Sequence, residues 1–198
     1  MSDHHLDRIF TPRSVAVIGA SKRVGSIGQI VLSNLIQGEF PGAIYAVNPK
    51  HEKIGSIDCF GSIAALPTPV DLVVICTPAC TVPDLIRQSG AAGILGVLII
   101  SAGFKESSPE GATLEHEIVS IAKSFPGMRI VGPNCLGIIS PHASLNASFA
   151  CDFPIRGNVA LISQSGALCT ALLDWALSEG IGFSQFVSIG NCLDVGIA

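Results

Sequence analysis

Several features that mark other classes of protein are missing from this sequence of 198 residues. It has one Tyr and one Trp and a formal net charge of −4, so it lacks the basic surface and the stacking aromatics of a nucleic-acid-binding protein. Its apolar runs are short, and none approaches the ~18 residues that would indicate a membrane-spanning helix. Residues 1–10 hold no apolar segment, so we expect no secretory signal. A content of 48 % hydrophobic and 13 % charged residues excludes a disordered chain.

Paired cysteine motifs are also missing. The seven cysteines are an odd number, and no CxxC pair occurs. Together with the absent secretory signal, this predicts a reducing cytoplasm in which the cysteines serve as small buried apolar residues. Cys76 and Cys80 have a spacing found in zinc sites, but no second pair follows, so we expect no metal site.

Short β-branched runs alternate with helix-like segments over the first two thirds of the chain. The run Val15–Ile18 ends in Gly19 and is typical of a buried parallel strand. Alternation of this kind predicts βαβ units and a doubly wound, Rossmann-like parallel sheet. The expected strands are 15–18, 44–47, 71–76, 97–100 and 129–131, and the expected helices are 26–37, 81–91 and 108–124.

The rhythm breaks over 132–157, where prolines and small polar residues predict a long connection. It then restarts with expected strands at 159–162 and 186–189 around a helix at 165–178. Two strands and one helix are too few for an α/β domain. We therefore expect a complete first domain over 8–142 and a truncated second domain over 143–198.

A glycine-rich turn lies between the first strand and the first helix, from Gly19 through Gly25 to Gly28. Such a turn lets backbone amides and a helix N-terminus meet an anion, and glycine is needed where a Cβ would obstruct it. The spacing differs from GxGxxG, so the motif alone is weak. Basic residues gather around it: residues 1–55 carry a net charge of +2, against −6 for the remainder.

The end of the second strand narrows the choice of ligand. Sites for NAD usually carry an Asp or Glu there, whereas this strand ends in Asn48-Pro49-Lys50. A lysine at this position favours a nucleotide with an additional phosphate, which is NADP or coenzyme A (CoA) with its 3′-phosphate. The alternative is a tight helix–strand packing turn with no ligand.

Five segments occur in the order Ser14–Ser21, Val47–Lys50, Ile99–Phe104, Gly132–Gly137 and Ser163–Gly166. Together they resemble the NDP-forming acyl-CoA synthetase superfamily. That group includes succinyl-CoA ligase α chains, ADP-forming acetyl-CoA synthetases and related protein lysine acetyltransferases. The resemblance covers about residues 8–195 and implies that a CoA-binding domain precedes a flavodoxin-like ligase domain.

The resemblance also implies which residues meet CoA. The family's phosphate-binding turn is matched by Gly19, Ser21, Lys22, Arg23 and Gly25, and a basic residue near the phosphates is matched by Lys50. The strand ends along the nucleotide and pantetheine are matched by Thr77, Pro78 and Ser101. The place of the CoA thiol is matched by Asn134 and Cys135. The succinate enzyme has Glu where this chain has Ala102, so succinate is not the expected substrate. The segments 146–149 and 173–175 are closer to the acetyl-CoA synthetase and acetyltransferase branch.

Ser165 and Gly166 open a helix directly after a strand, and a helix N-terminus attracts anions. In the resembled family this helix end stabilises a phosphorylated catalytic histidine, which would lie beyond residue 198. A serine nucleophile is excluded because the GxSxG pattern is absent and no histidine follows His142. An ordinary capped helix is the alternative. Cys135 has no evident base partner, so a small buried thiol is at least as good an interpretation as a nucleophile.

These observations predict the CoA- or acyl-CoA-binding part of a larger acyl-CoA synthetase-like protein, inactive by itself. The resemblance implies that the full protein uses ATP, Mg²⁺ and an ATP-grasp domain or subunit, and we expect it to be oligomeric. A different possibility is an acyl-CoA-sensing regulatory domain fused to an acetyltransferase domain. An NADP-dependent reductase is disfavoured because no candidate proton donor accompanies the turn.

Overall fold

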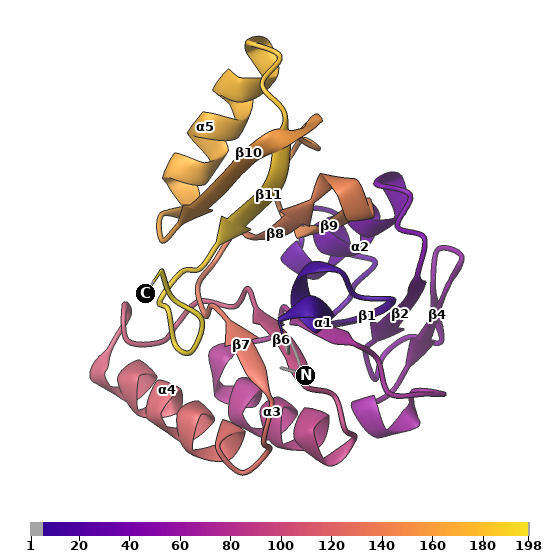
Figure 1. Cartoon of the computed structure of the whole chain (residues 1–198). Helices are drawn as coiled ribbons and strands as arrows, with labels where there is room; N and C mark the ends of the chain where they lie inside the picture. Colours follow the sequence, from indigo (N-terminus) through magenta and orange to yellow (C-terminus); the bar gives the residue numbers. More distant parts are fainter. Residues whose placement is uncertain (1–5, 198) are drawn as a thin grey trace.

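Two sheets organise the computed structural model, which describes residues 6–197 (Figure 1). The larger sheet has seven strands in the order β3-β4-β2-β1-β5-β6-β7, and all pair in parallel except β3 with β4. Its strands are β1 (Ser14–Ile18), β2 (Ala43–Val47), β3 (Lys53–Ile54), β4 (Ile57–Phe60), β5 (Leu72–Ile75), β6 (Gly96–Ile99) and β7 (Arg129–Val131). The accompanying helices are α1 (Asp7–Phe10), α2 (Ile27–Gln37), α3 (Val82–Ala91) and α4 (Pro109–Ala122), with short 3-10 turns at 63–65 and 79–81.

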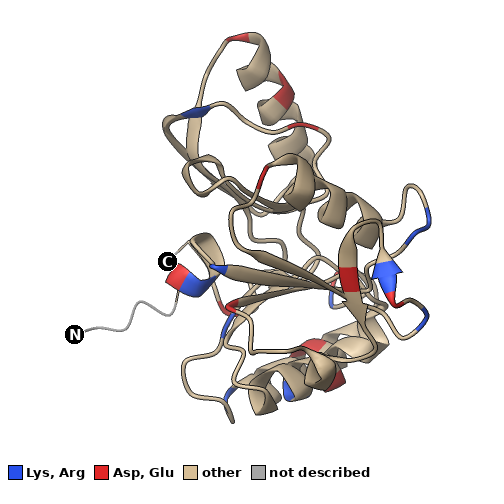
Figure 2. Ribbon diagram, turned by 90° about the vertical axis from the view of Figure 1, so that its right-hand side faces the viewer, with Lys and Arg blue, Asp and Glu red and all other residues tan. Residues whose placement is uncertain are grey.

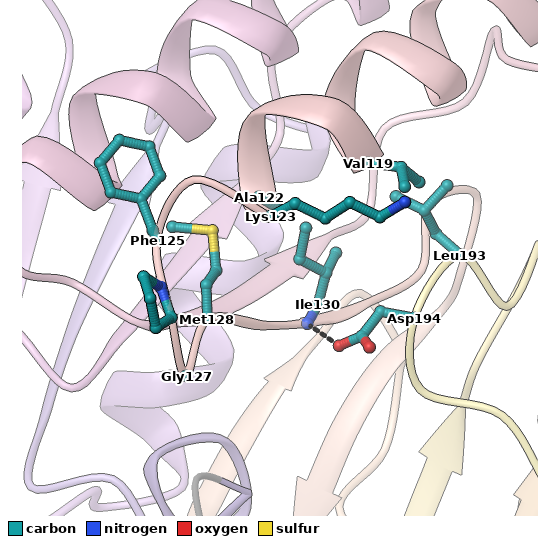
Figure 3. A pocket seen from close by; sticks show the side chains of 10 residues that line it. Val119, Ala122, Lys123, Phe125, Gly127, Met128, Ile130, Leu193 and Asp194 are labelled. Carbon is teal, nitrogen blue, oxygen red and sulfur yellow. Dashed lines mark hydrogen bonds between the residues drawn. The ribbon is translucent and has the colours of Figure 1, made fainter.

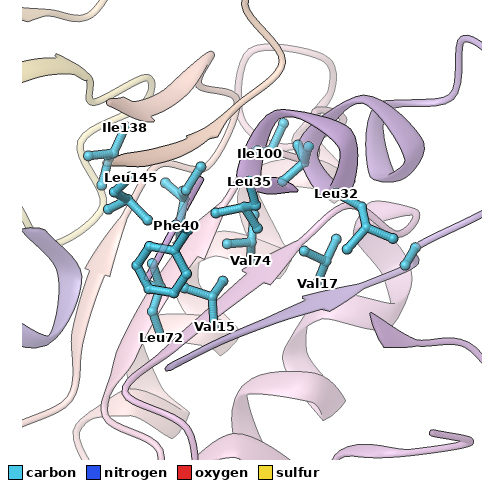
Figure 4. Packing of buried hydrophobic residues seen from close by; sticks show 14 of the residues in the cluster. Val15, Val17, Leu32, Leu35, Phe40, Leu72, Val74, Ile100, Ile138 and Leu145 are labelled. Atoms are coloured by element: carbon cyan, nitrogen blue, oxygen red, sulfur yellow. The ribbon is translucent and has the colours of Figure 1, made fainter. Parts of the chain in front are cut away.

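Both faces of this sheet are covered, which explains why its strands are continuous apolar runs. Along β1, Val15 and Val17 point into one core with Leu35 of α2, as Figure 4 shows. Ala16 and Ile18 point into the opposite core, which α3 and α4 complete. Alternate residues of one strand therefore fill two cores, as the period of two along a strand requires.

The order β2-β1-β5-β6-β7 confirms the predicted doubly wound α/β class. The chain adds β2 to β4 on one side of β1 and then β5 to β7 on its other side, so the strand order reverses between β1 and β5. In open α/β sheets, the crevice outside the carboxyl ends of the strands at such a point is where ligands bind. The fold thus directs attention to the segments that follow Ile18 and Ile75.

The predicted long connection over 132–157 was wrong, because it contains a β-hairpin. Strands β8 (Gly137–Ser140) and β9 (Leu145–Ser148) pair antiparallel around a 3-10 turn at 141–143. The segment has the polar composition of a loop, but its polar groups are satisfied internally. Ser148 Oγ donates to Asn146 Oδ1 at 2.6 Å, and Ala150 N donates to Ser148 Oγ at 3.2 Å.

This hairpin belongs to the second sheet, whose order is β10-β11-β8-β9. The other parts are β10 (Arg156–Ser163), α5 (Gly166–Ser178) and β11 (Phe183–Ser188). The larger sheet with its helices is called the first unit below, and the second sheet with α5 the second unit. Strand β8 contributes to both, because Ile138 lies in a core of the larger sheet and Ile139 in the core beneath α5. The expected division at 142/143 falls within the turn between β8 and β9.

Residues 191–195, called the return segment below, cross back from the second unit to the edge of the first sheet. Backbone amides of Asn191, Leu193 and Val195 donate to the carbonyls of Pro133, Gly132 and Ile130, at 2.9–3.1 Å. As one chain rises in number the other falls, so the return segment runs antiparallel to β7 and covers its outer edge.

The helices are short, and the longest, α4, has 14 residues. Across residues 6–197 no helix has the length and apolar character needed to cross a membrane. All seven cysteines lie within the described residues and are free thiols in this structure.

Candidate functional site

A pocket of about 550 Å³ lies at the carboxyl ends of β1, β2 and β5. Its walls include four residues that the sequence singled out, namely Gly19, Lys50, Thr77 and Pro78. The apolar side chains of Val47, Ile63 and Leu85 complete it. The pocket therefore combines an apolar interior with a backbone turn and a cation at its rim.

The turn between β1 and α2 adopts a conformation that requires glycine. Gly19 has φ +84°, and a Cβ there would lie 2.8 Å from Thr77 Cγ2. Gly25 has φ +79° with open space around it, so its backbone conformation alone demands glycine. A Cβ on Gly28 would overlap the carbonyl oxygen of Gly19, because α2 begins directly against the turn.

Polar contacts fix the shape of this turn. Ser21 Oγ accepts a hydrogen bond from Arg23 N at 3.0 Å, and Ser26 Oγ donates to Arg23 O at 2.7 Å. Asn48 ties the turn to the end of β2, since its Nδ2 donates to Ala20 O at 2.7 Å. Its Oδ1 accepts from Lys50 N at 2.9 Å, which sets the path of the chain at the rim.

Lys50 lines this pocket, whereas Lys22 and Arg23 belong to the adjoining glycine turn and do not line it. Within residues 6–197, no carboxylate oxygen lies within 4 Å of the side-chain nitrogens of Lys22, Arg23 or Lys50, and all three residues are exposed. Figure 2 shows basic positions on loops and on a short strand at the right-hand side of the larger unit. An anionic ligand at this rim would gain these charges without breaking an existing ion pair.

Ser101 plays a supporting role in the structure. It is buried, and its Oγ donates to Thr77 O at 2.6 Å and to Ile75 O at 3.2 Å. Its carbonyl accepts from Asn134 N at 2.9 Å. Ser101 therefore joins the ends of β5, β6 and β7 beneath the surface, and it does not line the pocket.

A second pocket, of about 430 Å³, lies over the ends of β6 and β7. It brings together four further predicted residues from distant parts of the chain: Asn134, Cys135, Ser165 and Gly166. Ala102 is also on its wall, and Ile27 extends it to the start of α2. The two pockets thus lie along the same edge of the sheet.

Cys135 is a protonated thiol in this arrangement. It is buried, and burial raises the pKa of its thiol to about 12. Its Sγ donates to Ile99 O at 3.3 Å. Because a thiolate is the reactive form, this geometry favours the interpretation of a small buried thiol over a nucleophile.

The N-terminus of α5 lines the second pocket, and two of its backbone amides have no acceptor in the described chain. Ser165 Oγ accepts from Leu168 N at 3.2 Å, and Ser165 N donates to Ser163 Oγ at 3.1 Å. In the described part of the chain, Gly166 N and Ala167 N have no acceptor. Their N–H groups and the helix dipole suit a negatively charged group.

None of the described histidines lines either pocket, although His51 directly follows Lys50. The side chains of His51 and His116 have no hydrogen-bond partner in the described chain, and His142 Nε2 lies 3.0 Å from Gly157 O. His4 and His5 fall outside the described residues. Over 6–197 there is no cluster of three His, Cys, Asp or Glu side chains that could hold a metal ion.

Sequence reasoning missed several lining residues. Thr81 and Gln88 of the α3 region line the first pocket, while Phe149 and Gln164 line the second. Gln164 lies inside a quoted motif, and Thr81 follows the third strand closely, so their positions offered a signal. Phe149 ends the segment 146–149 that was compared with the acetyl-CoA synthetase branch, but its place at the pocket depends on the β8–β9 hairpin, which was not predicted.

A third pocket, of about 410 Å³, holds none of the predicted residues (Figure 3). It lies between the end of α4 and the return segment, with Lys123 on one side and Asp194 on the other. Asp194 Oδ2 accepts from Ile130 N at 2.9 Å and from Arg129 Nε at 2.8 Å. This third pocket borders the amino end of β7, at the opposite edge of the sheet from the first two pockets.

Comparisons with known proteins match both units. The family model "CoA binding domain" matches residues 13–141, and "Succinyl-CoA ligase like flavodoxin domain" matches 156–198. An ADP-forming acetate–CoA ligase of Methanocaldococcus jannaschii is 46 % identical over 98 % of this chain and 27 % of its own length. The α subunit of ADP-forming acetate–CoA ligase II of Pyrococcus furiosus is 43 % identical over 98 % of this chain and 42 % of its own.

A solved structure agrees with these relatives. Dinucleotide-forming acetyl-coenzyme A synthetase 1 of Candidatus Korarchaeum cryptofilum, in complex with phosphate and ADP, superposes with a TM-score of 0.92 at 40 % identity. It is matched over 97 % of this chain and 41 % of its own. The chain thus spans less than half the length of these relatives. They give no support to the acetyltransferase alternative. The chain belongs to the CoA-binding-domain family, with an adjoining succinyl-CoA-ligase-like flavodoxin region, as in the NDP-forming acyl-CoA synthetases.

Proposed function

We propose that the chain binds CoA along the carboxyl edge of the larger sheet, with the nucleotide in the first pocket and the thiol end in the second. One observation carries this proposal: a glycine turn with unpaired cations and a second pocket facing a helix N-terminus share one sheet edge. Strands β2 and β7 are four spacings apart, which corresponds to about 20 Å. A compact ligand would fill one pocket, whereas an elongated ligand such as CoA reaches both.

Each part of the edge has a role in this arrangement. Lys22, Arg23 and Lys50 supply charge to the phosphates, and the Gly19–Gly25 turn lets its backbone approach them closely. Thr77 and Pro78 lie between the two ends of the ligand, and Asn134 stands at the thiol. The apolar residues Ile63 and Leu85 offer contact to the base.

We further propose that the whole protein is an ADP-forming acid–CoA ligase. In such a protein, ATP and Mg²⁺ would be handled by an ATP-grasp domain or subunit, and the free amides of Gly166 and Ala167 would stabilise a phosphoryl group brought to the second pocket. Among residues 6–197, no Lys or Arg lines that pocket, which disfavours an acyl group with a second carboxylate. This chain alone would bind CoA without turnover, in the cytoplasm.

Calorimetric titration of residues 1–198 tests the binding proposal directly. CoA and acetyl-CoA are expected to bind more tightly than NADP⁺ or NAD⁺, because the rim offers phosphate-binding cations and no carboxylate for a ribose. Tighter binding of either nicotinamide nucleotide would overturn the proposal.

Lys50→Ala sharpens this test at a single phosphate. If Lys50 pairs with the 3′-phosphate, the substitution should weaken CoA binding by about tenfold and leave 3′-dephospho-CoA nearly unchanged. Lys53→Ala is the matched control, because Lys53 lies on the neighbouring hairpin and pairs with Asp58 at 3.4 Å. Equal losses for both ligands in Lys50→Ala would place this lysine elsewhere than at the 3′-phosphate.

A further inference from the structure

Asn191 occupies the junction between the return segment and the wall of the second pocket. Its backbone amide donates to Pro133 O at 2.9 Å, directly beside Asn134. The approach is close, since a Cβ on the preceding Gly190 would overlap the carbonyl oxygens of Pro133 and Asn134. The return segment therefore presses on the turn that carries Asn134 and Cys135.

The side chain of Asn191 joins two carboxylates of the first unit. Its Nδ2 donates to Glu106 Oε2 at 2.6 Å and to Glu115 Oε1 at 2.5 Å. The Glu115 side chain is only 7 % exposed, and its other oxygen lies 3.5 Å from Lys105 Nζ. Lys105 Nζ also donates to Asn191 O at 2.8 Å. A buried carboxylate needs such partners, because removing one would leave its charge uncompensated.

Glu106 extends this network to the loop that follows β6. Its Oε1 accepts from Gly103 N at 2.8 Å and from Phe104 N at 3.1 Å. Partial burial would raise the pKa of the Glu106 carboxyl, but hydrogen bonds from Asn191 and from these amides lower it overall. The loop fixed in this way carries Ala102, which lines the second pocket.

On its other side, Asn191 contacts the predicted thiol-site residue. Asn134 Nδ2 donates to Asn191 Oδ1 at 3.4 Å, and Asn134 has φ +55°, a conformation that needs support from its surroundings. Asn134 N is held by Ser101 O. One amide side chain thus links the Ala102 loop, α4 and the Asn134 turn.

We propose that Asn191 is a positioning residue for the thiol end of CoA. By holding Asn134 and the Ala102 loop together, it sets the shape of the second pocket while leaving the first pocket, over β1, β2 and β5, untouched. This inference rests on the proposed function, because it assumes that the thiol end of CoA enters the second pocket.

The test compares CoA with adenosine 3′,5′-bisphosphate, which carries the nucleotide end without pantetheine. Residues 1–198 carrying Asn191→Ala should bind CoA about tenfold more weakly and the bisphosphate within about twofold of the unaltered chain. A general loss of structure would weaken both ligands together, so the ratio of the two affinities isolates positioning from folding.

Asp194→Asn is the matched control. Asp194 anchors the far end of the same return segment to Arg129 and Ile130, away from the second pocket. Its substitution should leave the affinity ratio unchanged. If Asn191→Ala does not fold, Glu106→Gln removes one charged partner of Asn191 and should shift the ratio in the same direction by about threefold.

The outcomes separate the two proposals. If CoA binds the unaltered chain but the ratio stays constant in Asn191→Ala or Glu106→Gln, the positioning role is overturned. Failure of the unaltered chain to bind CoA overturns the proposed function, and the positioning role falls with it.

Discussion

The two units contain strand segments that differ at one of four positions and lie in different surroundings. Val15-Ala-Val-Ile18 forms β1, and Val159-Ala-Leu-Ile162 lies in β10, each followed by a turn and a helix. Strand β1 has partners on both sides and is buried from Val15 to Ile18, whereas β10 lies at the edge of its sheet and most of its residues are exposed. A pattern of apolar residues thus predicts a strand well, but whether the strand is buried depends on which distant parts of the chain pack beside it.

The largest effect that this comparison predicts is on stability. Ile18 and Ile162 occupy equivalent places in the two segments, but their exposed fractions are 3 % and 51 %. Ile18→Ala should lower the free energy of unfolding by about 2–5 kcal/mol through lost burial and a cavity. Ile162→Ala should cost about 0.5 kcal/mol or less. Urea denaturation of both variants measures the difference, and equal losses would show that β10 is covered in solution.

The glycines at the starts of α2 and α5 give the next largest contrast. Gly28→Ala should destabilise the chain by about 1–3 kcal/mol and weaken CoA binding, because its Cβ overlaps Gly19 O. At Gly166 the nearest atom to a Cβ is Leu136 Cβ, at 3.8 Å. Gly166→Ala should therefore be neutral or stabilising by up to about 1 kcal/mol. Thermal unfolding and a CoA titration check both, and a tolerated Gly28→Ala would contradict the tight turn described for the first unit.

The smallest effect concerns local opening of the two units. Cys135 and Cys76 have thiol pKa values raised to about 12 by burial, and burial also raises the pKa of Cys169 under α5. Because α5 packs against a sheet with an open edge, Cys169 should react with iodoacetamide at pH 8 sooner than Cys135. The exposed Cys80 and Cys151 should react first and serve as internal references. Mass spectrometry of timed samples gives the order, and earlier labelling of Cys135 would reverse the comparison.

The fold was predictable from the sequence wherever burial left an apolar run. Strands β1, β5 and β6 were found for that reason, and the helices α2 to α5 through their caps and periodicity. The hairpins β3–β4 and β8–β9 were not found, because polar residues or glycine interrupt the apolar character of their strands. In β9, moreover, Asn146 and Ser148 are polar and are therefore typical of a loop, but in the structure they are buried and hydrogen-bonded to each other.

Some residues of the candidate site could likewise be predicted from the sequence, and others could not. Gly19, Lys50, Thr77 and Pro78 follow directly on predicted strands, and the structure gathers them at one pocket. Thr77, Pro78 and Asn134 were singled out by the resemblance, and Gly166 by its place at a helix N-terminus; Asn134 and Gly166 meet at the second pocket. The contribution of Asn191 could not be predicted, because it arises from a segment that crosses from one sheet to the other.

The covering of β7 by the return segment has a consequence for synthesis on the ribosome. The partners of β7 on that side emerge only after about 60 further residues, which takes about 3–12 s at ordinary elongation rates. During that interval the first sheet can assemble with one edge unpaired, a state that invites pairing with other chains. The nascent chain is therefore most open to misassembly just before residue 191 appears, and slow codons in that stretch would prolong the exposure.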